Sequence, residues 1–257
     1  MLCGVSEGGA SRVAFTVRDV HGRCRPDLLA ALRAQYERHA WIYDALASRP
    51  EAIFLAGRKP LVGGVVGNRR ILVKRLSHGG LLAPLSADRF LSPRRALANE
   101  TVADALNARG LATPDLVFAA WRRRGGLVRM EMGFELVEES EDAAAAAFGV
   151  NGESRRNAAA AMTAVGRLVA ALHRAGVYHH DLNLKNFLLT REGRVLILDV
   201  DKVSLGRRPL KAAARRRNLA RLTRSVRKLG RGAAPPEAVE ELVETLVTAY
   251  RTASETN

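Results

Sequence analysis

Cysteine and long apolar runs are both scarce in this sequence. Its 257 residues include only Cys3 and Cys24, with no histidine or second cysteine pair at the spacing of metal ligands, so we expect two reduced thiols. Residues 1–10 lack the basic head and apolar run of a secretory signal. No apolar stretch approaches the roughly 18 residues that a membrane span needs. These absences predict a cytoplasmic protein, although one that can rest on a membrane surface.

Acidic residues are also in short supply. The chain has 26 of them against 41 lysines and arginines, which gives a formal net charge of +15. A field of this sign attracts phosphates, nucleic acid or an anionic membrane face, so it restricts the partner without choosing one. With 47% hydrophobic residues the chain is otherwise an ordinary globular protein, able to bury the core of one domain or of two small lobes.

Short β-type runs dominate the first half of the chain, and helical patterns follow. The runs at 53–56, 60–67 and 71–76 are separated by glycines and predict an antiparallel sheet. The helical patterns at 94–109 and 154–175 are each followed by a glycine, which is a common helix stop. This order of elements predicts an α+β protein with a β-rich first part.

The segment 11–49 mixes a short alternating piece with a helical stretch from Pro26 to Ala47, and no chemistry is assigned to it. We expect 1–50 to be an extension that completes an N-terminal lobe and 51–140 to be that lobe. We expect 141–257 to be a C-terminal lobe that ends in basic helices.

Polar residues with a regular spacing follow the second helical pattern. Asp181 is followed five residues later by Asn186, and the apolar run 194–198 then leads directly to Asp199. Phosphoryl transfer needs one carboxylate to accept the proton of the attacking hydroxyl group. It also needs oxygen ligands that hold Mg²⁺ against the phosphates. We therefore predict Asp181 as the catalytic carboxylate that takes this proton, and Asn186 and Asp199 as the metal ligands.

This region resembles the protein kinases. His179, Asp181 and Asn186 match the catalytic loop H-R-D-x-x-x-x-N, with His180 in place of the arginine, and 199–201 (Asp-Val-Asp) stands where D-F-G would be. The resemblance implies a protein-kinase-like, two-lobed α+β fold, in which ATP is held between a β-rich N-terminal lobe and a mainly helical C-terminal lobe.

Lys74 ends the run Ile-Leu-Val-Lys, which has the form of the kinase strand whose lysine contacts the phosphates of ATP. We predict that Glu100, on the following helix, fixes this lysine, although Arg75 or Glu131 could compete with the pair. The glycines of the 57–67 stretch do not spell the phosphate-binding pattern G-x-G-x-x-G, so no contacts are assigned to that loop.

A narrower resemblance covers 53–206. The Gly79-Gly80 pair soon after Lys74, the loop H-x-D-L-N-x-x-N and an ending close to D-F-D are similar to the bacterial lipopolysaccharide kinases, among them the 3-deoxy-D-manno-octulosonic acid (Kdo) kinases. Val200 stands in place of the phenylalanine. The resemblance implies transfer of the γ-phosphate of ATP to a Kdo hydroxyl on a lipid A precursor, at the cytoplasmic face of the inner membrane. Gly79 and Gly80 could form a backbone turn near the phosphates or a purely structural one.

The segment 207–231 contains no acidic residue and is the best candidate for contact with an anionic inner-membrane surface. Leu219, Leu222, Val226 and Leu229 form an apolar stripe at helical spacing beside a basic face. Such a helix either lies on a membrane or packs its stripe on the C-terminal lobe. Nucleic acid is not expected as a partner, because no aromatic residues alternate with the charges. The basic residues are Arg207, Arg208, Lys211, Arg215, Arg216, Arg217, Arg221, Arg224, Arg227, Lys228 and Arg231.

Three alternative functions stay open. A kinase acting on protein Ser, Thr or Tyr residues is disfavoured, because His180 replaces the arginine that would pair with an activation-loop phosphate. Small-molecule phosphotransferases of the aminoglycoside or choline type share the Asp and Asn spacing. A pseudokinase or binding module would present the basic surface without catalysis, and the intact set of Asp181, Asn186 and Asp199 argues against it.

Overall fold

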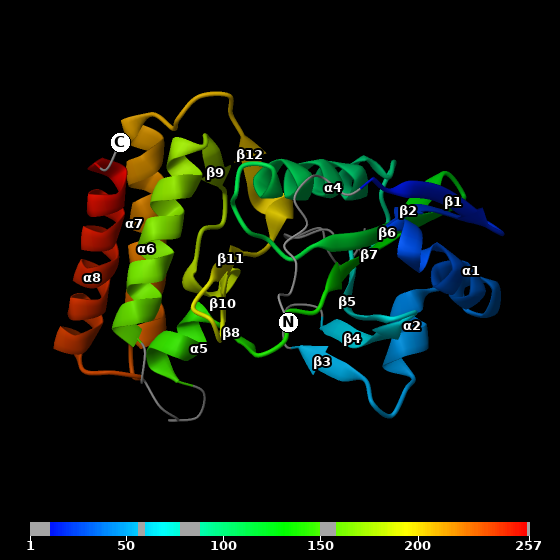
Figure 1. Cartoon of the computed structure of the whole chain (residues 1–257), viewed down its shortest axis with the longest axis horizontal. Helices are drawn as coiled ribbons and strands as arrows, with labels where there is room; N and C mark the ends of the chain where they lie inside the picture. Colours follow the sequence, from blue (N-terminus) through cyan, green and yellow to red (C-terminus); the bar gives the residue numbers. More distant parts are fainter. Residues whose placement is uncertain (1–10, 56–59, 78–87, 150–157, 256–257) are drawn as a thin grey trace. The chain divides into compact units, whose positions relative to one another are not determined.

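The computed structural model describes residues 11–55, 60–77, 88–149 and 158–255, and contacts divide the chain into two units (Figure 1). The first unit consists of the described residues of Met1–Ala105 together with Pro114–Leu136. The second consists of Leu106–Thr113 and the described residues of Val137–Asn257.

A seven-stranded sheet lies at the centre of the first unit. Its strand order is β1-β2-β6-β7-β5-β4-β3, and each neighbouring pair is antiparallel, which confirms the predicted antiparallel sheet. The strands are β1 (Val13–Val17), β2 (Val20–Cys24), β3 (Ile53–Leu55), β4 (Leu61–Val66), β5 (Arg69–Arg75), β6 (Leu116–Arg124) and β7 (Leu127–Glu135).

Helices cover both faces of this sheet (Figure 1). On one face, buried side chains of β5 such as Ile71 and Val73 share a core with α1 (Leu29–Arg38) and α2 (Ile42–Ala47). On the other face, Leu76 shares a second core with Ala96 of α4 (Arg94–Asn107). Alternate residues of a strand point to opposite faces, which is why Ile71 and Val73 enter one core while Leu76, just after β5, enters the other.

The helical stretch predicted from Pro26 to Ala47 is divided into a 3₁₀ turn at Pro26–Leu28 and the helices α1 and α2. The division has a local cause. The carboxylate of Glu131 accepts the backbone N–H groups of Ile42 and Tyr43, at 2.8 and 3.1 Å, and thereby caps the first turn of α2. A new helix therefore begins at Ile42.

Three long helices are the largest elements of the second unit: α6 (Ala158–Arg174), α7 (Ala212–Gly230) and α8 (Pro236–Glu255). Gly166 lets α6 and α8 approach closely, because a Cβ atom there would lie 2.4 Å from the carbonyl oxygen of Leu246. α6 ends before Gly176, whose φ of +75° is a left-handed value that glycine adopts without strain.

The remaining elements of this unit are short. A three-stranded sheet has the order β11-β10-β8, and a two-stranded sheet pairs β12 with β9. The elements are β8 (Ser140–Asp142), α5 (Ala143–Phe148), β9 (Val177–His179), the 3₁₀ turn η2 (Leu184–Asn186), β10 (Phe187–Thr190), β11 (Val195–Ile197), the 3₁₀ turn η3 (Val200–Lys202) and β12 (Val203–Leu205).

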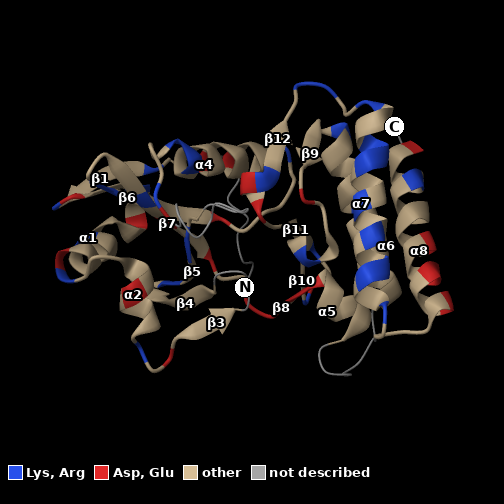
Figure 2. Ribbon diagram, turned by 180° about the vertical axis from the view of Figure 1, so that it is seen from behind, with Lys and Arg blue, Asp and Glu red and all other residues tan. Residues whose placement is uncertain are grey.

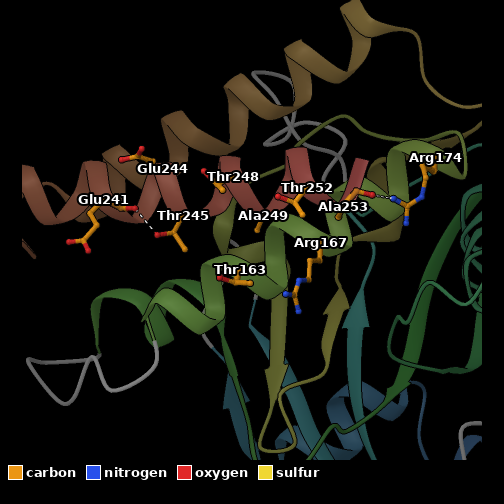
Figure 3. Close-up of a pocket in the computed structure, with 10 residues that line it drawn as sticks. All are labelled: Thr163, Arg167, Arg174, Glu241, Glu244, Thr245, Thr248, Ala249, Thr252 and Ala253. Atoms are coloured by element: carbon orange, nitrogen blue, oxygen red, sulfur yellow. Dashed lines mark hydrogen bonds between the residues drawn. The ribbon is translucent and has the colours of Figure 1, made fainter. Parts of the chain in front are cut away.

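A groove of about 810 Å³ runs between α6 and α8 (Figure 3). Both basic and acidic side chains line it, including Arg167 and Arg174 from α6 and Glu241 and Glu244 from α8. Arg174 donates a hydrogen bond to the carbonyl oxygen of Ala253 and so fastens the two helices at one end. All of the lining residues come from α6 and α8, and none of the predicted catalytic residues is among them.

The apolar stripe predicted on 207–231 packs inside the second unit. Leu222 and Val226 of α7 are fully buried, and Leu219 and Leu229 are half-buried. The helix therefore has no free apolar face to lay into a bilayer, and the alternative in which the stripe packs on the protein is the one observed. Most of the lysines and arginines of α7, whose positions are blue in Figure 2, are exposed. None of the described helices combines the length and apolarity needed to cross a membrane.

Candidate catalytic site

The predicted catalytic loop lies between β9 and β10. The side-chain amide of Asn186 donates a hydrogen bond to the carbonyl oxygen of Asp181 at 2.8 Å, so the structure brings these two residues together. Asn183 donates to the same oxygen at 3.0 Å and accepts the N–H of Lys185. Asn183 is therefore a structural residue of the loop, and the side chain of Asp181 is left exposed at its surface.

Asp199 lies directly after the strand that pairs with β10. The backbone N–H of Leu198 donates to the carbonyl oxygen of Asn186 at 2.8 Å, which joins the two predicted metal ligands through one residue. Asp199 itself has a φ of +57° and a ψ of +47°. A non-glycine residue in this left-handed region costs roughly 1–2 kcal/mol, and such strain is concentrated at functional sites.

His179 fastens the loop to the segment that carries Asp199. Its Nδ1 accepts the N–H of Asp181 at 3.2 Å, so the proton of the neutral ring is on Nε2, which donates to the carbonyl oxygen of Leu198 at 3.2 Å. The ring is 1% exposed, and this burial lowers the pKa of His179. A neutral His179 with this tautomer holds the two predicted halves of the site at a fixed separation.

His180, which replaces the arginine of the kinase motif, also has a structural partner. Its Nε2 lies 2.7 Å from the hydroxyl oxygen of Ser204 on β12, and its ring packs edge-on against Tyr178. The backbone N–H of His180 donates to the carbonyl oxygen of Lys202 at 2.7 Å. The histidine at this position therefore links the predicted catalytic loop to β12.

Helix α7 contacts the loop through residues that were not predicted from the sequence. Asn218 accepts the backbone N–H of His179 at 3.3 Å and donates to its carbonyl oxygen at 2.8 Å. Farther along the helix, Arg221 donates to the carbonyl oxygen of His180, and the hydroxyl group of Ser225 accepts the N–H of Leu184. One signal was present in the sequence, because Asn218 is a polar residue in line with the apolar stripe, four positions before Leu222.

A buried polar chain continues from Asn218 into the helices. Nε2 of His173 on α6 donates to the side-chain oxygen of Asn218 at 3.3 Å, and its Nδ1 accepts the hydroxyl group of Tyr250 on α8 at 3.0 Å. Burial lowers the pKa of His173 to about 4. The ring is therefore neutral at physiological pH, and three long helices are connected to the backbone of the catalytic loop.

Lys74 and Glu100 belong to the first unit, on the face of the sheet that α4 covers. Lys74 is opposite Met132 in the strand register, and the sulfur atom of Met132 accepts a hydrogen bond from Asn99 of α4. Glu100 is 6% exposed and forms ion pairs with Arg12 and Arg23. Its second oxygen, Oε2, is buried and has no hydrogen-bond partner among the described residues. The pairing of Lys74 with Glu100 stays a prediction that this shared face favours.

The two competitors considered for this pair lie on the opposite face. Arg75 pairs with Glu131 in the strand register, one residue out of step with Lys74. Glu131 is fully buried, and its carboxylate accepts the hydroxyl group of Tyr36 in addition to the two N–H groups of α2. Arg75 forms an ion pair with Asp44. Gly79 and Gly80 lie outside the described residues.

Asn186 and Asp199 fit the ligand chemistry of Mg²⁺. Because the amide nitrogen of Asn186 donates to the backbone of Asp181, its amide oxygen is left as a hard oxygen ligand, and the carboxylate of Asp199 offers another. Among the described residues, no three His, Cys, Asp or Glu side chains gather into a metal site. A kinase-type site does not need such a group, since nucleotide phosphates and water complete the coordination.

Comparison with known proteins gives consistent matches. The family model described as "Lipopolysaccharide kinase (Kdo/WaaP) family" matches residues 43–250. A 3-deoxy-D-manno-octulosonic acid kinase of Xylella fastidiosa is 32% identical over 183 residues, which are 70% of each chain. Enzymes with the same description from Stenotrophomonas maltophilia and Xanthomonas oryzae pv. oryzae are 34% and 32% identical, over 70% and 72% of each chain.

Proposed function

The chain belongs to the lipopolysaccharide kinase (Kdo/WaaP) family, and we propose from this that it transfers the γ-phosphate of ATP to a hydroxyl group of a Kdo sugar on a lipid A precursor. The observation that carries the proposal is the hydrogen-bonded loop in which Asn186 and His179 both bind Asp181. We infer that the two units correspond to the two lobes of a protein-kinase-like fold.

In the proposed reaction, Asp181 orients the acceptor hydroxyl group and takes its proton as the oxygen attacks the γ-phosphorus, whose bond to the bridging oxygen breaks to release ADP. Its exposed side chain on a loop fixed by His179 and Asn186 suits this role. Asn186 and Asp199 would hold Mg²⁺, which would neutralise charge on the transferred phosphoryl group. Lys74, fixed by Glu100, would position the ATP phosphates. Catalysis would then come mainly from positioning and electrostatic stabilisation.

The acceptor places the proposed reaction at the cytoplasmic face of the inner membrane. The exposed basic residues of 207–231 support this location, because anionic lipid attracts lysine and arginine near its surface. Since the apolar stripe of α7 is buried, the proposed attachment is electrostatic and peripheral.

The test is transfer of labelled γ-phosphate from ATP to three acceptors: a Kdo-bearing lipid A precursor, an aminoglycoside and a generic protein. Asp181→Ala, at an exposed position, is the control for transfer that depends on the loop. We expect label on the Kdo lipid alone, and none with the variant. Label on protein or on the aminoglycoside instead would reassign the enzyme, and nucleotide binding without any transfer would identify a pseudokinase.

A further inference from the structure

Four basic residues form a row along α7: Arg217, Arg221, Arg224 and Lys228. Their spacings of four, three and four residues place the other three within about 60° of Arg221 around the helix axis. Arg217, Arg224 and Lys228 are exposed, and within the described part of the chain none of these three forms an ion pair. Arg227, outside the row, donates two hydrogen bonds to the carboxylate of Glu240, one from each of two guanidinium nitrogens. The row is therefore a line of largely uncompensated positive charge (Figure 2).

The row lies beside the catalytic loop. Contacts between α7 and the loop advance in the same direction along both, from Asn218 with His179 to Ser225 with Leu184. Arg221 itself donates to the carbonyl oxygen of His180, next to Asp181. The backbone of Asp181 is thus held between two contacts with α7, one from Arg221 and one from Ser225. These two residues are four positions apart, which is about 6 Å along the helix axis.

An anionic acceptor needs positive charge at this place. Asp181 is negative, and so is the phosphoryl group that an acceptor meets, so an acceptor that is itself an acid is repelled unless cations lie close by. The related enzymes act, by their description, on a sugar acid. Arginine is well suited to a carboxylate, because its planar fork of N–H groups can bind both oxygens.

We propose that Arg217 and Arg224 bind the carboxylate group of the sugar-acid acceptor and so present its hydroxyl group to Asp181. Arg221 lies between them and keeps its bond to the loop. The inference rests on the proposed function and deepens it by assigning residues to acceptor recognition. It also divides the basic surface into two parts, because this row includes Arg221, which bonds to the loop, while the other exposed cations of 207–231 are left to the membrane.

The test uses free Kdo and its methyl ester, two soluble sugars that differ in the negative charge and need no bilayer. Binding of each sugar is measured by calorimetry, and transfer by steady-state kinetics, for the native protein, Arg217→Gln and Arg224→Gln. Arg251→Gln, an exposed arginine on α8, is the matched control. We expect each row variant to weaken binding of the acid roughly tenfold and to raise its KM similarly, with kcat and the KM for ATP little changed. The ester should bind weakly and equally to all four proteins.

Each other outcome has one meaning. Equal losses for the acid and the ester, or no loss for either, would overturn the assignment of Arg217 and Arg224 even if transfer proceeds. If the native protein binds the acid through these arginines yet transfers no phosphate, the proposed reaction fails and the anion site stands. If the native protein does not bind the acid at all, both proposals fall.

Discussion

Asn218 bonds to both backbone polar groups of His179, accepting its N–H at 3.3 Å and donating to its carbonyl oxygen at 2.8 Å. The side chain is 1% exposed, so these hydrogen bonds are made away from bulk water. We expect Asn218→Ala to lower the free energy of unfolding by about 3 kcal/mol, because buried polar groups of His179 lose their partners. Transfer activity should fall as well, since the loop that carries Asp181 is loosened. Chemical denaturation and kinetics are the measurements, and Thr248→Ala, exposed on α8, is the control.

Asp199 combines a strained backbone with a predicted metal-binding role, and the two can be separated. Asp199→Asn keeps a residue type that tolerates left-handed φ but removes the charge. We expect transfer to fall by at least about a hundredfold, while the melting temperature changes little. Glu192→Gln, in the exposed turn between β10 and β11, should leave transfer intact. Near-normal transfer by Asp199→Asn would contradict the metal-ligand assignment.

Lys74 and Glu131 are two strand positions with opposite expected phenotypes. We expect Lys74→Met to raise the KM for ATP and to slow transfer, because the proposed lysine contact is with phosphate. We expect Glu131→Gln to cost about 1–3 kcal/mol of stability, because an amide cannot accept all three hydrogen bonds of the buried carboxylate. Denaturation curves and ATP titrations for both variants check this. The reverse pattern, in which Glu131→Gln impairs the use of ATP and Lys74→Met only destabilises the protein, would contradict both assignments.

Much of the predicted site depends on contacts that are local in sequence. Asp181 and Asn186 are five residues apart, and the chain itself keeps them close, so their spacing alone implied the contact that is observed. The position of Asp199 is local for the same reason, because the short hairpin of β10 and β11 returns the chain to the loop. The antiparallel sheet was predictable for a related reason, since glycine-separated apolar runs are short-range signals.

Contacts between distant segments were not predictable in the same way. Asn218 meets His179 across 39 residues, and only the packing of α7 against β9 decides which face of an arginine-rich helix touches the loop. The placement of Glu131 required the register of β5 and β7, which puts it opposite Arg75 and not Lys74. Sequence reasoning also continued one helix through residues 39–41, because the cap on α2 comes from a strand about 90 residues later.

His173 makes stability depend on pH. Its folded pKa of about 4 lies below the ordinary histidine value near 6.5. Between these two values the unfolded chain binds a proton at this residue and the folded chain does not. Stability from this residue is complete above about pH 6.5 and declines as the pH falls toward 4, by about 3 kcal/mol in total. We expect His173→Gln to flatten the fall in denaturation midpoint between pH 7 and pH 5. His39→Gln, at an exposed position, should leave the slope unchanged, and an unchanged slope in His173→Gln would refute the assignment.

Membrane attachment through charge alone has a measurable signature. We expect the protein to sediment with vesicles that contain anionic phospholipid and not to bind purely zwitterionic vesicles. We expect it to be released from the anionic vesicles as the salt concentration rises to about 0.5 M. Arg216→Gln should weaken vesicle binding about fivefold. Arg227→Gln is a matched control with a smaller effect, because Glu240 already neutralises that arginine. Binding that persists in high salt would require an apolar anchor.

The buried carboxylate of Glu131 determines where this protein can be shortened. The family match begins at residue 43, yet two of the three groups that Glu131 accepts, the Tyr36 hydroxyl and the Ile42 N–H, lie before that point. A recombinant fragment that starts at the homology boundary would leave a fully buried acid with one remaining donor, and it would also lose the edge strand β1 and its neighbour β2. Expression trials designed from the family alignment alone should therefore yield insoluble material, whereas fragments that begin before residue 12 should remain soluble.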